Sequence, residues 1–312
     1  MNNQANKLPI ISSKERLAQK QGIKGCIFGK SGIGKTSLLW TLDPLKTLFI
    51  DLEAGDLATR GWDGDTIRPK TWQDCRDFAV FIGKDNPALS HTQAYSQAHY
   101  DAICKQFGDP CSLDKYETIF IDSMTVVGRL CFSWCKNQPQ SFSDKTGKPD
   151  IRGTYGLHGQ EMIGWLTHLQ HVREKNIWFL GILDERLDDF GHRIFTPQIE
   201  GSKTGLELPG IVDQVITMAE INNGDNAPTR AFINHTINPY GYPAKDRSGR
   251  LDMMEEAHLG KLMEKIKSPL QTRNPYLTTQ KQQENDDEKG GHIVSTLGTQ
   301  KLGIVNNQIK GE

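Results

Sequence analysis

The sequence predicts an α/β fold in which a mostly parallel central sheet carries helices on both faces and an antiparallel extension on its C-terminal side. Four apolar, β-rich runs alternate with helical or loop segments, at residues 23–28, 47–52, 118–122 and 176–183. Nearly continuous apolar strands of this kind are typical of a parallel sheet covered on both faces. The later strands follow one another without intervening helices, at residues 194–199, 215–218 and 230–237. Consecutive short strands indicate antiparallel pairing.

Two helices and one turn are also predicted with defined positions. Residues 157–175 carry a buried stripe at helical spacing, made of Met162, Ile163, Leu166, Leu169 and Val172. Thr71-Trp72-Gln73-Asp74 resembles a capping box and predicts a helix that begins there. The polar segment 186–192 predicts a turn before the returning strand.

The chain divides by composition into three parts. Residues 1–20 are polar and lack a sustained period, so we expect a flexible arm, followed by one domain over residues 21–267. Residues 268–312 form a polar tail whose composition predicts disorder. A short apolar patch at Ile293–Val305 either belongs to that disorder or docks on a partner.

Composition restricts the class of protein. Only 36% of the 312 residues are apolar and the net charge is −1, so any contact with nucleic acid must come from local patches. The six cysteines do not have the spacing typical of a disulfide framework, which is consistent with a reducing cytoplasm. Cys131 and Cys135 either pair on a metal or are small buried thiols; the absence of a second pair favours thiols. No apolar run approaches membrane-spanning length. We expect a soluble cytoplasmic protein without a membrane partner.

The first predicted strand leads into a glycine-rich segment that fits the phosphate-loop pattern G-x-x-x-x-G-K-[ST] at every fixed position. Backbone N–H groups of such a loop and the N-terminus of the next helix bind a polyphosphate. We expect Lys35 to contact the β- and γ-phosphates and the Thr36 hydroxyl to bind Mg²⁺. The sequence therefore predicts binding of ATP or GTP by Gly29, Lys30, Ser31, Gly32, Ile33, Gly34, Lys35, Thr36 and Ser37.

Two carboxylates are candidates for the remaining chemistry. Asp122 ends a buried strand, at the edge where ligands bind in open α/β sheets, and we expect it to hold Mg²⁺. It can also cap the next helix. In Phe49-Ile50-Asp51-Leu52-Glu53, Glu53 is nearer the strand end and is the better candidate for the general base on water. The alternatives for Glu53 are a surface acid or a helix cap.

These segments together resemble the RecA-type ATPase core, in which the glutamate of the second strand is the catalytic base. The resemblance implies a RecA-like P-loop NTPase fold over residues 23–267 and assigns that role to Glu53. Residues 244–252 (Ala-Lys-Asp-Arg-Ser-Gly-Arg-Leu-Asp) resemble the closing motif of phage-encoded ATP-binding proteins, some of which are RecA-like ATPases encoded beside single-strand annealing proteins. Asp150-x-Arg152-x-x-Tyr155-Gly156 and Leu208-Pro209-x-x-x-Asp213-x-Val215 resemble further landmarks of these proteins.

The resemblance also implies an oligomer with active sites between subunits. Lys245 and Arg247 lie two apart and can face one way. In RecA-like rings and filaments the equivalent basic residues reach the γ-phosphate of the neighbouring subunit, where they stabilise charge in the transition state. A solvated basic turn is the alternative. The chain departs from the RecA pattern after its fourth strand, where Asp184-Glu185-Arg186 replaces a polar sensor, and an acid there needs Mg²⁺ or Arg186 to offset its charge.

Contact with single-stranded DNA is predicted mainly by the resemblance. The segment 136–155 has a net charge of +2 and carries Phe142 and Tyr155, whose rings can stack on bases. The segment 184–205 has a net charge of −2 and repels phosphate, although Lys203 within it can face a nucleotide across a subunit boundary.

Three functions remain open from the sequence. The leading one is an Mg²⁺-dependent ATPase of a phage recombination or replication module in the host bacterial cytoplasm, acting on single-stranded DNA or on an annealing or single-strand-binding partner. A partition-type ATPase is the alternative suggested by Lys30, although Ser31 departs from that loop and Lys245 has no role there. The third is a nucleotide-gated regulator with little turnover. No guanine-reading motif is present, and the resemblance favours ATP over GTP.

Overall fold

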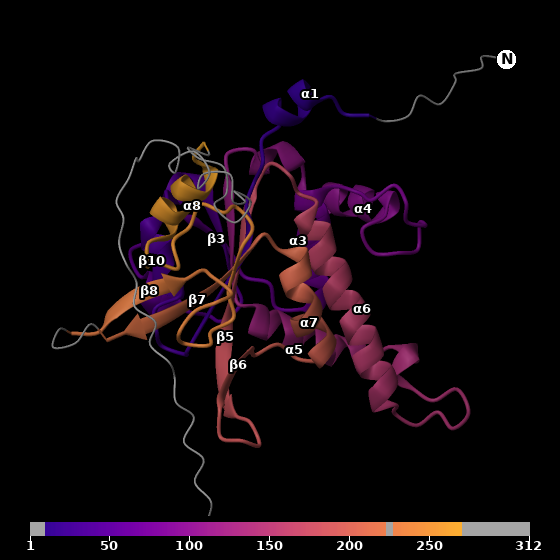
Figure 1. The fold of residues 1–312 in the computed structure, drawn as a ribbon. Coiled ribbons are helices and arrows are strands. Elements are labelled where there is room, and N and C mark those ends of the chain that lie inside the picture. The colour runs from indigo at the N-terminus through magenta and orange to yellow at the C-terminus, as the bar shows by residue number, and fades with distance from the viewer. Residues whose placement is uncertain (1–9, 223–226, 270–312) are drawn as a thin grey trace, which may run out of the picture. The chain divides into compact units, whose positions relative to one another are not determined.

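A computed structural model describes residues 10–222 and 227–269 and shows a ten-stranded mixed sheet with helices on both faces (Figure 1). This confirms the predicted fold class, a mostly parallel P-loop NTPase core with an antiparallel extension. The strands are β1 (Lys24–Gly29), β2 (Thr47–Asp51), β3 (Asp65–Ile67), β4 (Thr118–Asp122), β5 (Asn176–Leu187), β6 (Arg193–Pro197), β7 (Gln214–Ile221), β8 (Thr229–Ile233), β9 (Lys245–Asp246) and β10 (Met254–Glu256).

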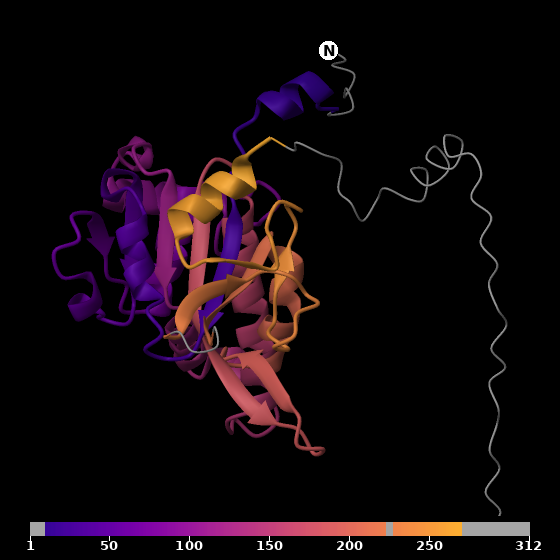
Figure 2. The same cartoon turned by 60° about the vertical axis from the view of Figure 1, so that its left-hand side comes forward.

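The strand order is β10-β8-β7-β1-β5-β4-β2-β3, with β6 paired to β5 and β9 paired to β7. The strands from β7 through β1, β5, β4 and β2 to β3 run parallel, whereas β6, β8, β9 and β10 pair antiparallel. The carboxyl ends of β1, β2 and β4 therefore share one edge of the sheet. The β5–β6 hairpin extends beyond that edge (Figure 2).

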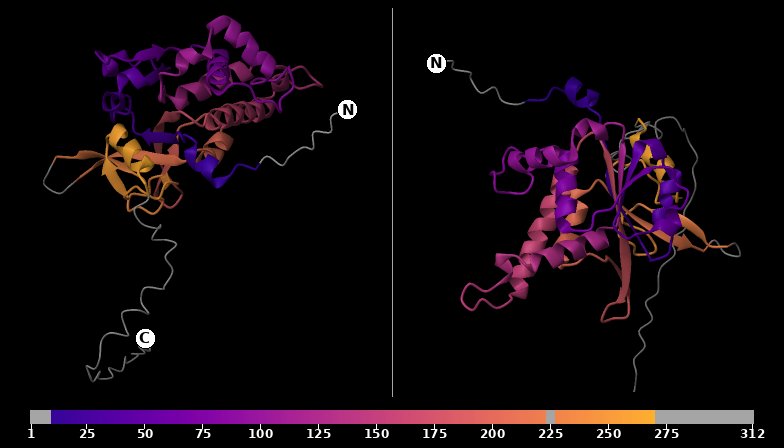
Figure 3. Two further views of the ribbon diagram at one scale, coloured as in Figure 1. Left: turned by 90° about the horizontal axis from the view of Figure 1, so that it is seen from above. Right: turned by 180° about the vertical axis from the view of Figure 1, so that it is seen from behind.

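Helices cover both faces of the sheet. The α-helices are α1 (Ser13–Ala18), α2 (Asp56–Thr59), α3 (Trp72–Gly83), α4 (Gln97–Phe107), α5 (Met124–Cys135), α6 (Ile151–Gln170), α7 (Ser202–Ile211) and α8 (Leu259–Lys267). The 3₁₀ helices are η1 (Thr36–Thr41), η2 (Pro44–Lys46), η3 (Pro110–Leu113) and η4 (Pro139–Ser141). Seen from above, α3 to α6 lie on one side of the sheet and α8 on the other (Figure 3).

Alternate side chains of the central strands enter two separate cores. In β1, Cys26 and Phe28 pack into the core that contains α3, α5 and α6, whereas Ile27 packs into the core that contains η1 and α8. β4 repeats the pattern, with Ile121 in the first core and Phe120 in the second. Because both faces are apolar, the strands read as continuous hydrophobic runs, which is why the sequence identified them.

Several boundaries differ from the predictions. The helix expected after the phosphate loop is the 3₁₀ helix η1 rather than an α-helix. The expected arm is not wholly irregular, because Ser12 and Glu15 form a capping box and α1 follows. The predicted helix 157–175 begins earlier, at Ile151, where Asp150 caps it, and ends at Gln170. The capping box at Thr71 is confirmed.

The remaining expectations concern the cysteines and the tail. Cys131 and Cys135 are buried in α5 with their Sγ atoms 4.0 Å apart, and burial raises the pKa of the Cys131 thiol. Both are thus small core side chains. The predicted disordered tail lies outside the described residues beyond Pro269, and so does the patch Ile293–Val305.

Candidate active site

The phosphate loop leaves β1 at Gly29 and turns through two glycines in the left-handed region, Gly32 at φ 78° and Gly34 at φ 99°. Residues with a Cβ rarely adopt such angles, so the loop requires glycine at both positions. Lys35 is 9% exposed, and its ammonium donates to the carbonyl oxygens of Gly29 at 3.0 Å and Lys30 at 3.1 Å. Burial lowers the pKa of Lys35, and the Asp122 and Glu53 carboxylates oppose that shift. The ammonium therefore sits inside the loop.

Asp122 reaches the phosphate loop from β4, two strands away from β1. The Thr36 hydroxyl donates a hydrogen bond to its Oδ2. Asp122 is 2% exposed, and burial raises its pKa to about 6, an effect to which the nearby Glu53 carboxylate adds. Ser123, and not Asp122, is the N-cap residue of α5, so the capping alternative is not realised.

The donor set at Thr36 and Asp122 fits Mg²⁺. Mg²⁺ prefers oxygen ligands and takes most of them from phosphates and water, so one carboxylate and one hydroxyl are enough from the protein. In the two described ranges no group of three or more His, Cys, Asp or Glu side chains is arranged to hold a metal alone. A buried carboxylate with a raised pKa is also a group whose charged form a cation would stabilise.

Glu53 follows β2 and faces the same edge of the sheet. Its Oε1 accepts a hydrogen bond from the Ser123 hydroxyl, and its charge acts on both Lys35 and Asp122. It does not cap a helix, because Gly55 is the N-cap residue of α2. Asp51 has a different role: it is 3% exposed, accepts from the Gly55 amide at 3.3 Å and pairs with Arg68 at 3.2 Å. Asp51 is therefore a buried structural acid, whereas Glu53 remains the candidate base.

A protein-family model described as an AAA domain matches residues 21–248, well over half of the chain. The chain belongs to this AAA-domain family. Members of this family are generally ATPases that bind nucleotides, which agrees with a phosphate loop whose lysine and threonine meet a buried aspartate. No curated protein matches the chain. None of the described helices is long and apolar enough to cross a membrane.

Arg230 lies beside the phosphate loop, a position that the sequence did not indicate. A Cβ placed on Gly34 would lie 2.7 Å from Arg230 Nη1, so the guanidinium lies against the phosphate loop. Arg230 comes from β8, which is joined to β1 only through β7. Arg230 and Gly34 are almost 200 residues apart in the sequence, and the strand order of the sheet brings them together. No local sequence motif marks Arg230.

The acidic end of β5 is neutralised by cations. Lys30 Nζ lies 2.8 Å from Glu185 Oε2, and Arg193 lies 3.4 Å from the other oxygen of that carboxylate. Arg186 pairs with Asp184 at 2.9 Å. The sequence analysis named Arg186 as a group that could offset the acidic charge here. It did not predict that Lys30 and Arg193 both pair with Glu185. The charge of this strand end is thereby largely cancelled beside the phosphate loop.

Lys245 and Arg247 do face one way, but toward α7. β9 pairs with the start of β7, where Val215 lies opposite Lys245. That position is level with Cys26 of β1, on the side away from the phosphate loop. Three residues of strand separate Cys26 from Gly29, where the loop begins, which is about 10 Å. Lys245 is half-buried and Arg247 lies on an exposed bend. Both side chains bond to the end of α7 and not to the active site of their own chain.

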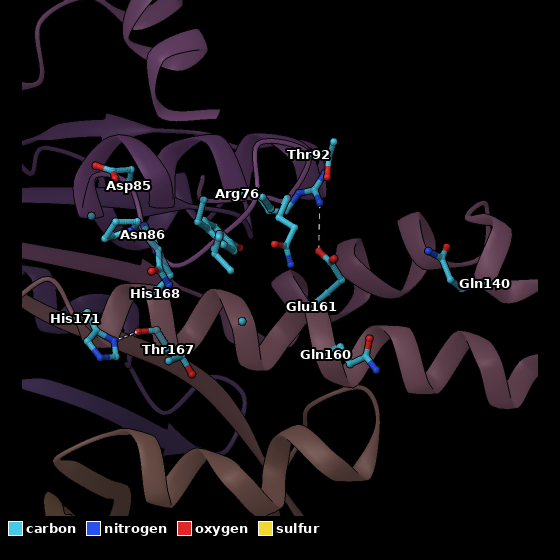
Figure 4. A pocket seen from close by; sticks show the side chains of 17 residues that line it. Arg76, Asp85, Asn86, Thr92, Gln140, Gln160, Glu161, Thr167, His168 and His171 are labelled. Carbon is cyan, nitrogen blue, oxygen red and sulfur yellow. Dashed lines mark hydrogen bonds and ion pairs between the residues drawn. The ribbon is translucent and has the colours of Figure 1, made fainter. Parts of the chain in front are cut away.

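A pocket of about 820 Å³ lies away from the phosphate loop between segment 84–96 and α6 (Figure 4). Arg76 and Glu161 form an ion pair at its wall, and His168 stacks on Tyr95 with ring centroids 4.4 Å apart. None of the predicted site residues lines it. A second pocket of about 470 Å³ is bordered by loop residues 30–33 and by Tyr242.

Proposed function

We propose that this AAA domain binds and hydrolyses ATP with Mg²⁺, as a RecA-like protein of a phage recombination or replication module. It acts on single-stranded DNA or on an annealing or single-strand-binding partner. The observation that carries the proposal is the meeting of four side chains from three segments: Lys35 and Thr36 from the loop, Glu53 after β2 and Asp122 on β4. Lys35 provides a positive charge for the phosphates, Thr36 and Asp122 provide a metal site, and Glu53 provides a base.

Each residue has a separate task in hydrolysis. When ATP binds, the Lys35 ammonium exchanges the Gly29 and Lys30 carbonyls for β- and γ-phosphate oxygens. Thr36 and Asp122 would hold Mg²⁺, which would supply positive charge to neutralise the charge that develops on the phosphates. Glu53 orients the attacking water and takes its proton. The Ser123 hydroxyl fixes the Glu53 carboxylate from the residue next to Asp122, which keeps base and metal ligand together.

Support for the RecA-like assignment comes from the placement of the two carboxylates. β2, which Glu53 follows, and β4, which ends at Asp122, are direct neighbours, with Asp51 opposite Asp122. This agrees with the role of the second-strand glutamate in the RecA-type core. Lys245 and Arg247 lie at the far end of the sheet, and we infer that they act on the nucleotide of an adjacent subunit. The resulting homo-oligomer has its active sites between subunits.

Support for DNA contact comes from exposed rings on the two long segments. Phe142 is 39% and Tyr155 is 42% exposed, and Phe190 at the tip of the β5–β6 hairpin is 86% exposed. Exposed aromatic faces stack on unpaired bases without regard to sequence. The partition-type alternative has no observation in its favour, since the extra lysine of its loop, Lys30, pairs with Glu185 of the same chain.

Steady-state ATP hydrolysis with and without single-stranded DNA, at low and moderate salt, tests the proposal. We expect hydrolysis that requires Mg²⁺, and stimulation by DNA that weakens as salt rises. An equal rate of hydrolysis with and without DNA at both salt concentrations would contradict action on single-stranded DNA and favour action on the protein partner. No hydrolysis in any condition would contradict the enzyme and favour the nucleotide-gated regulator.

A further inference from the structure

The pocket of about 820 Å³ in Figure 4 runs along one face of α6 and is separate from the active site. Its residues on and just after α6 are Gln160, Glu161, Gly164, Thr167, His168 and His171. Spacings of three and four residues place side chains on one face of a helix. The helix rises about 16 Å from Gln160 to His171, which matches about five residues of an extended chain. This α6 pocket is therefore long enough to take a short peptide segment.

The opposite wall of the α6 pocket is the loop 86–95, whose position against the helix is fixed. The Asn86 amide donates a 2.8 Å hydrogen bond to the Tyr95 carbonyl oxygen and closes the base of the loop. Tyr95 has a φ of 66°, which large side chains rarely adopt, and its ring stacks on His168 of α6. Leu89 of the same loop packs against the hydrophobic core. Both walls are thus in place before a ligand binds, which lowers the cost of binding.

Two polar groups in the wall of this pocket lack a hydrogen-bond partner within the described residues. They are the Tyr95 hydroxyl and Arg76 Nε. Tyr95 is 7% exposed, and the charges of Glu161 and Arg76 both act on its hydroxyl, so the hydroxyl lies close to that ion pair. A buried donor without a partner costs free energy that a hydrogen-bond acceptor recovers. The pocket therefore favours a ligand that brings an acceptor to this point.

The neighbouring Glu161 carboxylate determines what kind of acceptor fits. Glu161 Oε2 accepts a 2.9 Å hydrogen bond from the Trp72 indole and a 3.3 Å hydrogen bond from Arg76 Nη1. Since this carboxylate already neutralises Arg76, a second anion here would be repelled by it. A neutral carbonyl oxygen, as in a peptide group, can accept without that cost.

Asp85 gives another part of the pocket a preference for a basic side chain. Figure 4 shows Asp85 away from Glu161 and on the side of His168, on whose imidazole its charge acts. Its half-buried carboxylate forms no ion pair within residues 10–222 and 227–269. Charge-assisted hydrogen bonds from lysine or arginine are the strong contacts of such a carboxylate.

Side-chain amides supply contacts at the other end of the pocket. Gln140 and Gln160 are exposed and line it (Figure 4), and neither side-chain amide has a partner in the described parts of the chain. Each amide offers both donors and an acceptor. That combination matches the alternating N–H and C=O groups of an extended peptide backbone.

We propose that the α6 pocket binds an extended segment of a partner protein that carries a lysine or an arginine. The basic side chain of the segment pairs with Asp85. A backbone carbonyl inserted beside the ion pair accepts from Arg76 Nε and the Tyr95 hydroxyl, and Gln140 and Gln160 bond the backbone further along. The pocket shares no residue with the phosphate loop, so this binding does not depend on ATP hydrolysis.

A random peptide library displayed on phage and selected on the full chain tests the pocket. Selected peptides are synthesised with a fluorophore, and anisotropy gives their Kd. The pocket variants are Asp85→Asn and Gln160→Ala, and the matched controls are Asp101→Asn and Gln106→Ala, which change exposed residues of α4. We expect Kd to rise about tenfold in Asp85→Asn and about threefold in Gln160→Ala, and to stay at the wild-type value in both controls. Replacing the basic residue of the peptide by alanine should raise Kd about tenfold for wild type and have little effect for Asp85→Asn.

The outcomes decide the inference without reference to the active site. Selected peptides that contain a lysine or an arginine and lose affinity only in the pocket variants support it. It is wrong if no peptide is selected, if the selected peptides lack a basic residue, or if they bind the pocket variants as tightly as wild type. Failure of the proposed function is seen separately, as wild-type protein that does not hydrolyse ATP.

Discussion

Lys245 Nζ donates a 2.9 Å hydrogen bond to the carbonyl oxygen of Val212, the C-cap residue of α7. Arg247 also contacts this helix end. Its Nη2 donates a 3.3 Å hydrogen bond to the Gly210 carbonyl oxygen, and its Nη1 donates a 2.9 Å hydrogen bond to the Asp213 carboxylate. Cations at the last carbonyls of a helix satisfy orphan acceptors and oppose the helix dipole. The pair thus stabilises α7 in its own chain, and any contact with phosphate must be made to a neighbouring subunit.

Replacing both cations tests that contact. We expect Lys245→Ala with Arg247→Ala to lower ATP hydrolysis by about 10³-fold or more, because charge in the transition state loses its partner. Lost contacts to α7 should also cost about 1–2 kcal/mol of stability, visible as a lower Tm. Phosphate release and thermal unfolding are measured together, with Arg173→Ala, an exposed arginine, as the control.

Mixing subunits separates the two roles of the pair. The double variant retains Glu53, and a Glu53→Gln chain retains Lys245 and Arg247. A mixed oligomer therefore contains interfaces with one intact base and one intact cationic pair. We expect hydrolysis to recover in the mixture, whereas activity that stays at the level of the separate variants would mean that the pair does not act between subunits.

Arg230→Ala should weaken ATP binding. The guanidinium lies beside Gly34, where it can form charge-assisted hydrogen bonds to phosphate, so we expect the Kd for ATP to rise about tenfold. Arg230→Lys should recover part of the loss, because the charge remains without the planar fork. Isothermal titration measures both, with Arg173→Ala again as the control; equal affinities in all the proteins would remove Arg230 from the site.

Acid should destabilise the protein through His168. Burial lowers the pKa of His168 to about 4, whereas an imidazole in the unfolded chain titrates near 6.5. The unfolded state then binds the proton first, so stability is complete above about pH 6.5 and is lost as the pH falls toward 4. His158, whose pKa burial also lowers, contributes in the same direction.

A non-titrating variant isolates this effect. Denaturant unfolding between pH 7 and 5 should show a smaller loss of stability in His168→Gln than in wild type. The matched control is His171→Gln, which removes an exposed histidine one turn along the chain and should follow wild type. If the stability of His168→Gln falls with pH as steeply as that of wild type, the buried imidazole of His168 is not the cause of the acid destabilisation.

How much the sequence predicted depended on whether the signal was local. The positions of the glycine-rich loop after β1 and of Asp122 at the end of β4 could be predicted because each adjoins a buried strand on one stretch of chain. The start of α6 was missed because residues 151–156 include Gly153 and Gly156 and lack an apolar stripe. There the Asp150 cap and the close approach to Gln140, whose carbonyl oxygen would lie 2.4 Å from a Cβ on Gly153, fix the helix.

Contacts between distant segments were the part that the sequence could not supply. Arg230 reaches Gly34 only because β8, β7 and β1 are neighbours in the sheet. Lys30 meets Glu185 because β5 lies beside β1. The spacing of Lys245 and Arg247 predicted that they share a face, but their contact with the end of α7 depends on the pairing of β9 with β7.

The most direct test of the account is phosphate release from Mg²⁺-ATP by wild type and by Glu53→Gln, with ATP binding measured in the same samples. Glu264→Gln, an exposed glutamate on α8, serves as the matched control. We predict that Glu53→Gln binds ATP as wild type does and hydrolyses it about 10²–10⁴-fold more slowly. Equal hydrolysis by wild type and Glu53→Gln would contradict the assignment of Glu53 as the base and, with it, the proposed active site.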